Sequence, residues 1–299
     1  MCHIVYGSTP MSTTADTKFF LPLRDGARLH YRDSGAGAGA AIILLHGWGA
    51  SGDFFERQAA LAQQGLRLIV PDLRGHGLSQ GGPEGPQRGP LTLAVLAADV
   101  GELIAQLGLE RYSLVGWSMG AMVAWEHLRG AGLGRLDKLS VVDMTAKIVT
   151  DEGWPHGLTG GYPEAMVAPT VAAVRADWAR LAQTSAAKLF ARGTRAEPAL
   201  LARLTALMRA NAAEGLAQLW SDMARQDFRA LLPRLGERCQ YIYGKESRLY
   251  NEATFLQLAR LTGTSRLVGL AGAGHAPQWE QPEAFAAALS GHLAPRGQV

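Results

Sequence analysis

The segment Gly116-Trp117-Ser118-Met119-Gly120 has the residue types and spacing of a site that could do chemistry. It follows an apolar run at 112–115 and precedes an apolar, alanine-rich stretch long enough for a helix. A serine in a tight strand-to-helix turn needs small residues two positions to either side, and Gly116 and Gly120 supply them. Such a turn exposes the serine hydroxyl and aims the N–H groups of the following helix at the group it attacks. A chain with 36 glycines can contain this pattern by chance, but the strand before it and the helix after it favour Ser118 as a nucleophile.

A histidine that suits the role of base lies near the other end of the chain. A serine hydroxyl is a weak nucleophile until a neighbouring base takes its proton, and an imidazole with a pKa near 6.5 suits this task. His275 follows the last expected strand in a glycine-rich loop, which favours it as the base. Among the other histidines, we expect His46 and His76 to brace the loops that carry them. His46, His156 and Trp117 are candidates for the wall of a pocket around Ser118.

Alternating strand and helix patterns must position these groups. Asp25-Gly26 lies between two strand-like runs, at 19–23 and 29–32, and predicts a hairpin. Continuous apolar runs predict buried strands at 41–45, 66–70, 112–115, 139–142, 239–243 and 266–270. Helical spacing predicts helices at 53–64, 93–107 and 252–261, and a last helix that begins at Pro282. The alternation predicts an α/β fold with a mostly parallel, doubly wound sheet of eight strands and helices on both faces.

The pattern changes between residues 144 and 236, where strand-like runs disappear and helical patterns replace them. We expect residues 16–143 and 237–299 to form the core and residues 144–236 to form an all-helical cap. The cap should lie over the carboxyl ends of the strands, where such sheets bind ligands. Residues 1–15 are expected to be a tail, in which Met11 is an alternative start.

Four motifs carry a resemblance to a known family that extends over nearly the whole chain. The chain resembles the capped esterases of the α/β-hydrolase superfamily, which include the pimeloyl-acyl-carrier-protein methyl ester esterases. The motifs that carry the resemblance, in this order and spacing, are His46-Gly47-Trp48-Gly49, Asp72-Leu73-Arg74-Gly75-His76-Gly77, Gly116-Trp117-Ser118-Met119-Gly120 and Gly272-Ala273-Gly274-His275. The resemblance implies a serine nucleophile, a histidine base after the last strand, an acid between them in sequence and no cofactor.

The acid departs from the usual pattern of the family. Many relatives have an aspartate at the third position after the glycine that ends strand seven, and Ser247 occupies that position here. A serine cannot support an imidazolium as a carboxylate does. Asp143, at the end of the strand after the nucleophile's helix, keeps the chain order of serine, acid and histidine and is the favoured alternative. Glu246, one position before Ser247, is the second alternative, and Asp143 could instead cap a turn.

Two backbone N–H groups are needed to hold the negative oxygen that forms when an ester carbonyl is attacked. The N–H of Met119, directly after the nucleophile, is one candidate. The family places the second at the residue after His-Gly, which is Trp48 here. The side chains of Trp48 and Trp117 could also form part of the wall around the acyl group.

Composition excludes several other classes of protein. The net charge is +3, and the basic residues are spread along the chain, which argues against nucleic-acid binding. The sequence contains no zinc-protease, paired-cysteine or phosphate-loop motif, so we expect neither metal nor nucleotide. The two cysteines, Cys2 and Cys239, lie far apart, and the sequence contains no run of 18 apolar residues. The opening residues lack the basic and apolar regions typical of a signal peptide, so we do not expect one. We therefore expect a cytoplasmic protein without a membrane partner.

The leading hypothesis is a carboxylesterase that acts on a short-to-medium acyl ester through Ser118, His275 and Asp143. An acyltransferase or a hydrolase of C–C bonds could use the same residues, and a ligand-binding protein on the same scaffold is a further alternative. Residues 144–236 contain eleven basic and eight acidic residues, and this excess equals the net charge of the whole chain. Such an excess is typical of a solvated helical surface, which is the favoured interpretation. The resemblance to the pimeloyl-acyl-carrier-protein esterases implies an alternative, in which arginines of the cap bind an acidic acyl carrier protein.

Overall fold

The computed structural model describes residues 18–35, 41–79 and 89–293 of the 299-residue chain. The expected tail lies outside these residues. The described core contains eight strands: β1 (Lys18–Pro22), β2 (Arg28–Asp33), β3 (Ala41–Leu45), β4 (Arg67–Pro71), β5 (Tyr112–Trp117), β6 (Leu136–Val142), β7 (Cys239–Gly244) and β8 (Leu267–Leu270). They form one sheet in the order β1-β2-β4-β3-β5-β6-β7-β8. Only β2 runs antiparallel to its neighbours β1 and β4, which confirms the mostly parallel sheet and the hairpin.

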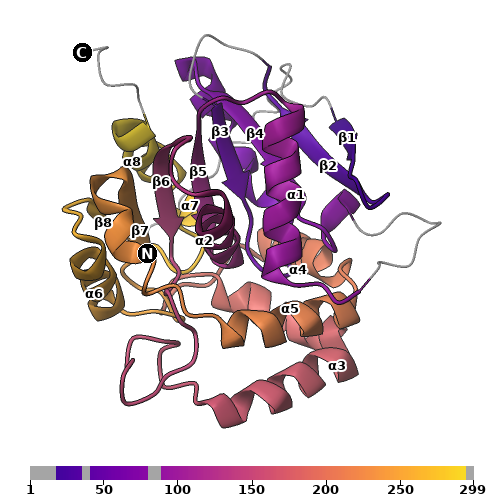
Figure 1. Ribbon diagram of the computed structural model, residues 1–299. Coiled ribbons are helices and arrows are strands. Elements are labelled where there is room, and N and C mark those ends of the chain that lie inside the picture. The colour runs from indigo at the N-terminus through magenta and orange to yellow at the C-terminus, as the bar shows by residue number, and fades with distance from the viewer. Residues whose placement is uncertain (1–17, 36–40, 80–88, 294–299) are drawn as a thin grey trace.

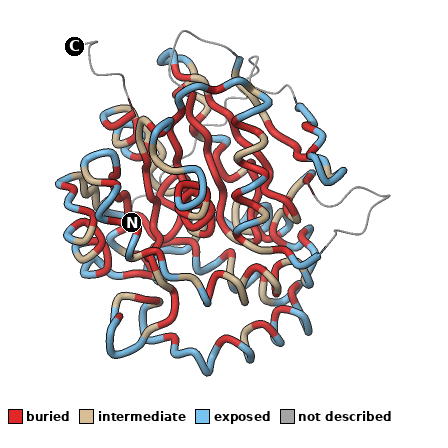
Figure 2. The backbone as a smooth tube through the Cα atoms, viewed as in Figure 1, coloured by how far each residue is buried: buried red, intermediate tan, exposed pale blue. Residues whose placement is uncertain are grey.

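The central strands are covered on both faces. Every residue of β3, β5 and β7 is buried, as expected from their continuous apolar runs, and Figure 2 shows this buried centre. The helices α1 (Leu93–Gln106) and α2 (Met119–Ala131) pack together in front of the sheet in the view of Figure 1. On the other face, α8 (Pro282–Leu293) packs against the helical segment η1 (Gly52–Gln64). The helix α6 (Glu252–Thr262) packs on β7 and β8.

Two local features differ from the sequence-based expectations. The helix expected at 53–64 is a 3₁₀ helix, in which the buried residues Phe55, Gln58 and Leu61 recur every three positions. This spacing matches the three residues per turn of a 3₁₀ helix, whereas an apolar pattern alone does not distinguish it from an α-helix. The short helix α7 (Pro277–Glu280), directly after His275, was not expected.

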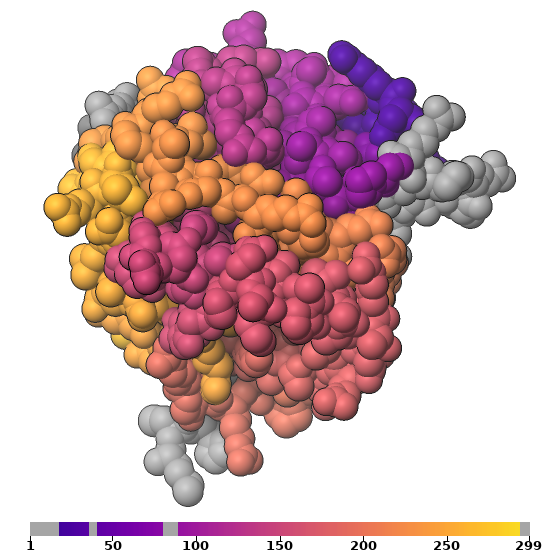
Figure 3. Space-filling model, turned by 60° about the horizontal axis from the view of Figure 1, so that its bottom comes forward, coloured from indigo at the N-terminus to yellow at the C-terminus, as the bar shows by residue number. Residues whose placement is uncertain are grey.

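The segment 144–236, named here the insertion, connects β6 to β7. It contains α3 (Val167–Lys188), α4 (Pro198–Arg209) and α5 (Ala213–Arg225), and α3 packs against both of the others. Figure 1 shows these helices beyond the carboxyl ends of the strands, and Figure 3 shows the insertion covering that side of the molecule.

The expectation of an all-helical insertion is wrong for its first twenty residues. Residues 144–163 form turns and loops, with one isolated strand-type bridge between Asp151 and Trp154. The physical reason is local composition, because four glycines and two prolines lie between residues 153 and 163 and both residue types disfavour a helix.

Candidate active site

Ser118 occupies the turn between β5 and α2 in a strained backbone conformation. Its φ is 53° and its ψ is −125°. Among the described residues other than glycine, only Ser118 and Asp143 have a positive φ, which is 44° for Asp143. Backbone strain of this kind costs about 1–3 kcal/mol per residue and is concentrated at functional sites. The two strained residues lie at the ends of neighbouring strands, β5 and β6.

The glycines around Ser118 are required by close backbone contacts. A Cβ at Gly116 would lie 2.5 Å from the backbone of Ala121, and a Cβ at Gly120 would lie 2.0 Å from the carbonyl oxygen of Leu45. No larger residue fits at either position without moving the backbone. The backbone of the turn is therefore in close contact with the start of α2 on one side and with the end of β3 on the other.

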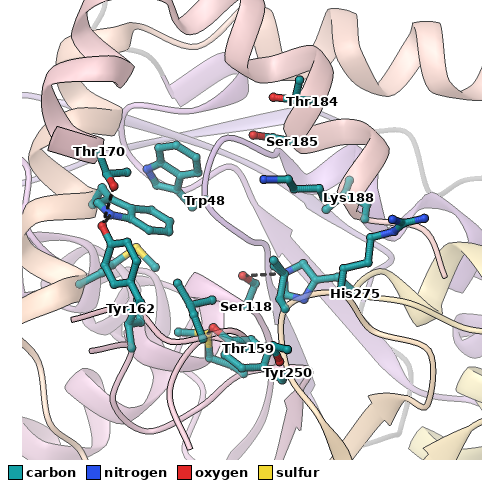
Figure 4. Close-up of a pocket in the computed structure, with 18 of the residues that line it drawn as sticks. Trp48, Ser118, Thr159, Tyr162, Thr170, Thr184, Ser185, Lys188, Tyr250 and His275 are labelled. Carbon is teal, nitrogen blue, oxygen red and sulfur yellow. Dashed lines mark hydrogen bonds between the residues drawn. The ribbon is translucent and has the colours of Figure 1, made fainter. Parts of the chain in front are cut away.

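Ser118, His275 and Asp143 form a continuous chain of hydrogen bonds. His275 Nε2 lies 3.0 Å from Ser118 Oγ, and this contact is drawn in Figure 4. On the other side of the imidazole, Nδ1 lies 2.6 Å from Asp143 Oδ2. Asp143 is completely buried and His275 is 3% exposed. With Nδ1 donating to the carboxylate, Nε2 is free to accept the serine proton.

Asp143 is held by the loop that follows β7. The Ser247 hydroxyl donates to Asp143 Oδ2 at 2.8 Å, and the Gly244 N–H donates to Oδ1 at 3.3 Å. Glu246, the alternative acid, turns away and accepts the Gly272 N–H at 2.8 Å. Ser247, at the position where the resemblance implied an aspartate, therefore contributes a hydroxyl that contacts the carboxylate at the end of β6.

The turn after β3 lies directly against Ser118. A Cβ at Gly47 would lie 3.1 Å from the Cβ of Ser118. Trp48 follows Gly47 in this turn, and Met119 follows Ser118 as the first residue of α2. The Trp48 side chain extends to the insertion, where its indole N–H donates to the carbonyl of Leu216 at 2.9 Å.

The three pocket candidates Trp117, His46 and His156 lie outside the cavity wall, so their assignment to it is wrong. Trp117 is buried because it stacks on Phe54, with ring centroids 5.3 Å apart. Its indole N–H donates to the backbone carbonyl of His275 at 2.6 Å, so it supports the candidate base from behind.

His46 and His156, the two histidines among these candidates, make structural contacts instead. His46 is completely buried, which lowers its pKa, and its Nε2 accepts the N–H of Leu73 at 2.9 Å. His76 similarly accepts the Gly49 N–H at 3.1 Å, so both residues brace their loops as expected. His156 packs its ring against Trp154 at 5.2 Å.

A cavity of about 700 Å³ opens above Ser118 and His275, and most of its wall comes from the insertion. Aromatic and aliphatic side chains dominate one end, among them Trp48, Tyr162 and Trp220. The sequence interpretation did not single out the basic residues of the wall, Lys188, Arg192 and Arg248. One sequence signal could have placed Lys188 beside other wall residues, because Leu181, Thr184, Ser185 and Lys188 of α3 have the spacing of one helix face.

Within the described ranges, no group of three or more histidine, cysteine, aspartate or glutamate side chains could hold a metal ion. The same part of the chain has no helix that is long and apolar enough to cross a membrane.

A comparison with models of protein families identifies the class of protein to which this fold and site belong. The model described as "Alpha/beta hydrolase family" matches residues 42–288. The chain belongs to this family.

Individual relatives agree with the resemblance noted from the sequence motifs. A pimeloyl-[acyl-carrier protein] methyl ester esterase of Stenotrophomonas maltophilia is 28% identical over 276 residues, covering 86% of this chain and 94% of the relative. The crystal structure of a hydrolase from Pseudomonas aeruginosa is 29% identical, with a TM-score of 0.78 and coverage of 94% of this chain and 100% of that one. An esterase from Exiguobacterium antarcticum, at 23% identity, shares the fold with a TM-score of 0.82 over 93% of this chain and 99% of its own. The expectation of an enzyme of the carboxylesterase class agrees with these names.

Proposed function

We propose that this protein is a serine carboxylesterase that cleaves short-to-medium acyl esters, with Ser118 as nucleophile, His275 as base and Asp143 as acid. The observation that carries the proposal is the hydrogen-bond chain of 3.0 Å and 2.6 Å that joins the three side chains. Membership of the hydrolase family and the esterase names of relatives support hydrolysis of an ester as the reaction.

The proposed reaction proceeds in two stages. His275 Nε2 takes the proton of Ser118 Oγ as the oxygen attacks the ester carbonyl, and the N–H groups of Trp48 and Met119 stabilise the resulting oxyanion. His275 then gives the proton to the departing alcohol, which leaves an acyl group on Ser118. A water molecule, deprotonated by His275, releases the acid and regenerates the serine. Asp143 fixes the tautomer of His275 and stabilises the imidazolium.

The insertion is proposed to act as the cap that selects the substrate. It supplies most of the cavity wall, while Ser118 and His275 come from the core. The insertion also contacts the core beside the base, because the Ala276 N–H donates to the Leu189 carbonyl at 3.0 Å and the Ala191 N–H donates to the Glu280 carboxylate at 2.7 Å. Substrate contacts and base are therefore positioned by the same part of the fold.

A spectrophotometric assay with 4-nitrophenyl acetate and butyrate tests the proposed activity. The wild-type protein should release nitrophenol, and Ser118→Ala should lower kcat/KM by about a thousandfold or more, because the remaining groups can only bind the ester. A folded Ser118→Ala variant that keeps its activity would show that another group is the nucleophile. A wild-type protein without activity would favour a ligand-binding role.

An acyl carrier protein is a second proposed partner, which would bind the insertion while the ester on its acyl chain enters the cavity. The relative from S. maltophilia is named for such a substrate, and the basic excess of the insertion would attract an acidic carrier. If so, the KM for a methyl ester of an acyl group that is carried on an acyl carrier protein should rise with ionic strength. The KM for the same acyl methyl ester without the carrier should not. Equal salt dependence for the two substrates would contradict a role for the carrier.

A further inference from the structure

The cavity above Ser118 has a cationic side without compensating acids. Lys188, Arg192 and Arg248 contribute to its wall, and none of the described lining residues is an aspartate or a glutamate. The three residues come from the end of α3, the loop directly after it and the loop after β7. Segments that are far apart in sequence therefore place three positive charges at one cavity.

The hydrogen-bond partners of the two arginines are backbone carbonyls. Arg192 donates from Nε and Nη2 to the Ser247 carbonyl, at 3.0 and 2.7 Å. Arg248 donates to the carbonyls of Phe190 and Ala191, at 3.1 and 3.3 Å. A guanidinium has five N–H donors, so each arginine keeps donors in addition to those that fix its position. The carbonyl contacts orient the guanidinium groups, and no described carboxylate forms an ion pair with either of them.

Four other basic residues of the insertion are ion-paired, unlike this set. Lys147 is ion-paired with Asp151, and Arg175 with Glu214; Arg203 and Arg229 are paired with Glu56 and Asp227. Within the part of the chain that the structure describes, Lys188, Arg192 and Arg248 form no ion pair. Arg180, Arg195, Arg209, Arg225 and Arg234 of the insertion also have no ion pair among the described residues, but they do not line the cavity. What distinguishes Lys188, Arg192 and Arg248 is that they share one cavity wall that has no carboxylate.

Lys188 is directed into the cavity. Figure 4 shows its amino group pointing into the space above Ser118 and His275, next to Thr184 and Ser185 of the same helix. Opposite this polar face of α3 lies the aromatic end of the cavity, with Trp48 and Tyr162. The cavity therefore has an apolar end and a cationic end, and the candidate nucleophile lies between them.

We infer that the cationic set Lys188, Arg192 and Arg248 binds a carboxylate of the substrate, so that among esters without a carrier the preferred one has a free carboxylate away from the bond that is cleaved. This inference rests on the proposed esterase function and specifies the class of its substrate. Hydrogen bonds between ionised partners are about twice as strong as neutral ones, and the planar guanidinium matches a carboxylate in geometry. The carboxylate would also supply the negative charge that the cavity wall lacks.

Matched pairs of esters test the inference. Monomethyl esters of dicarboxylic acids from succinate to pimelate are compared with methyl esters of monocarboxylic acids in which a methyl group replaces the carboxylate. A second pair, butyrylglycolate and ethyl butyrate, places the carboxylate on the alcohol side. We expect kcat/KM to favour the charged ester about tenfold or more in at least one pair, as one charge-assisted contact allows.

Lys188→Met removes one charge and keeps the length of the side chain. It should lower the ratio of charged to neutral kcat/KM by about tenfold. Lys245→Met is the matched control, because Lys245 is exposed, lies beside Gly269 of β8 and is not part of the cavity wall. It should leave the ratio unchanged. Equal effects of the two substitutions would indicate that the overall charge of the protein, rather than a subsite, sets the preference.

The outcomes separate the subsite from the esterase proposal. Hydrolysis of neutral esters by Ser118, without a preference for the charged member of any pair, would overturn the subsite and leave the esterase proposal intact. Calorimetric titration of Ser118→Ala with dicarboxylates measures the subsite independently of turnover. Binding that weakens in the Ser118→Ala/Lys188→Met double variant is expected, and no binding of any dicarboxylate would overturn the inference even if turnover were absent.

Discussion

Asp143 and Ser247 together show how the candidate site accommodates a missing aspartate. The carboxylate comes from the end of β6, and the hydroxyl of Ser247 contacts it from the loop after β7. Each of the two positions alone is ambiguous in sequence, since an aspartate after a strand often caps a turn. The structure joins them at 2.8 Å, which gives the serine a role that sequence motifs did not indicate.

Replacing Asp143 by Asn tests the acid at the residue scale. The amide cannot stabilise an imidazolium as a carboxylate does, so kcat should fall by about a thousandfold or more while the protein remains folded. Glu246→Gln is the matched control, because the Glu246 carboxylate contacts the Gly272 N–H instead of His275. Its activity should stay within about twofold of wild type. The reverse pattern would identify Glu246 as the acid.

At the scale of elements, the loops around the sheet are connected by one buried carboxylate, Asp72, which follows β4. It contacts His30 Nδ1 at 2.9 Å and accepts the N–H groups of Gly52 and Leu78 at 2.7 and 2.8 Å. Burial by itself raises the pKa of Asp72, but the hydrogen bonds outweigh it and hold the pKa at about 2. The loops after β3 and β4 are thus fixed to β2.

The depressed pKa of Asp72 predicts the pH dependence of its contribution to stability. Because the folded-state pKa lies below the unfolded value of 3.8, the contribution is complete above pH 4 and is lost as the pH falls towards 2. Asp72→Asn should lower the free energy of unfolding by about 2 kcal/mol at neutral pH and by much less near pH 2. Denaturant titrations at several pH values measure this difference. Asp137→Asn, at a more exposed ion pair with Arg111, should change stability by less than about 1 kcal/mol, and an equal loss in both variants would contradict the prediction.

At the scale of the whole molecule, the sequence predicted the core better than the insertion. The central strands are continuous apolar runs covered on both faces, so their place in the sequence can be predicted from those runs alone. The helices α3, α4 and α5 were also predictable from their periodic apolar faces. The glycines and prolines between residues 153 and 163 argue against a helix, so the error at 144–163 was avoidable. The path of this loop could not be predicted, because it depends on contacts such as that of the Thr150 N–H with the Tyr162 carbonyl at 2.9 Å.

The candidate site likewise contains residues that the sequence predicts and residues that it does not. Ser118 and His275 belong to motifs with local backbone requirements, and those requirements can be read from neighbouring glycines. Lys188, Arg192 and Arg248 are basic residues on exposed segments, and their shared position arises only when the insertion folds over the sheet. The packing of distant segments, which no local pattern encodes, determines the cationic side of the cavity.

The central claim is that His275 activates Ser118, and covalent labelling tests it most directly. A fluorophosphonate reacts with activated serines, and tandem mass spectrometry of the digested protein locates the adduct. We predict one adduct per chain, on Ser118, and a labelling rate that falls by about a hundredfold or more in His275→Ala, because the serine then lacks its base. An adduct on another residue, or labelling of Ser118 at the same rate with and without His275, would contradict the account.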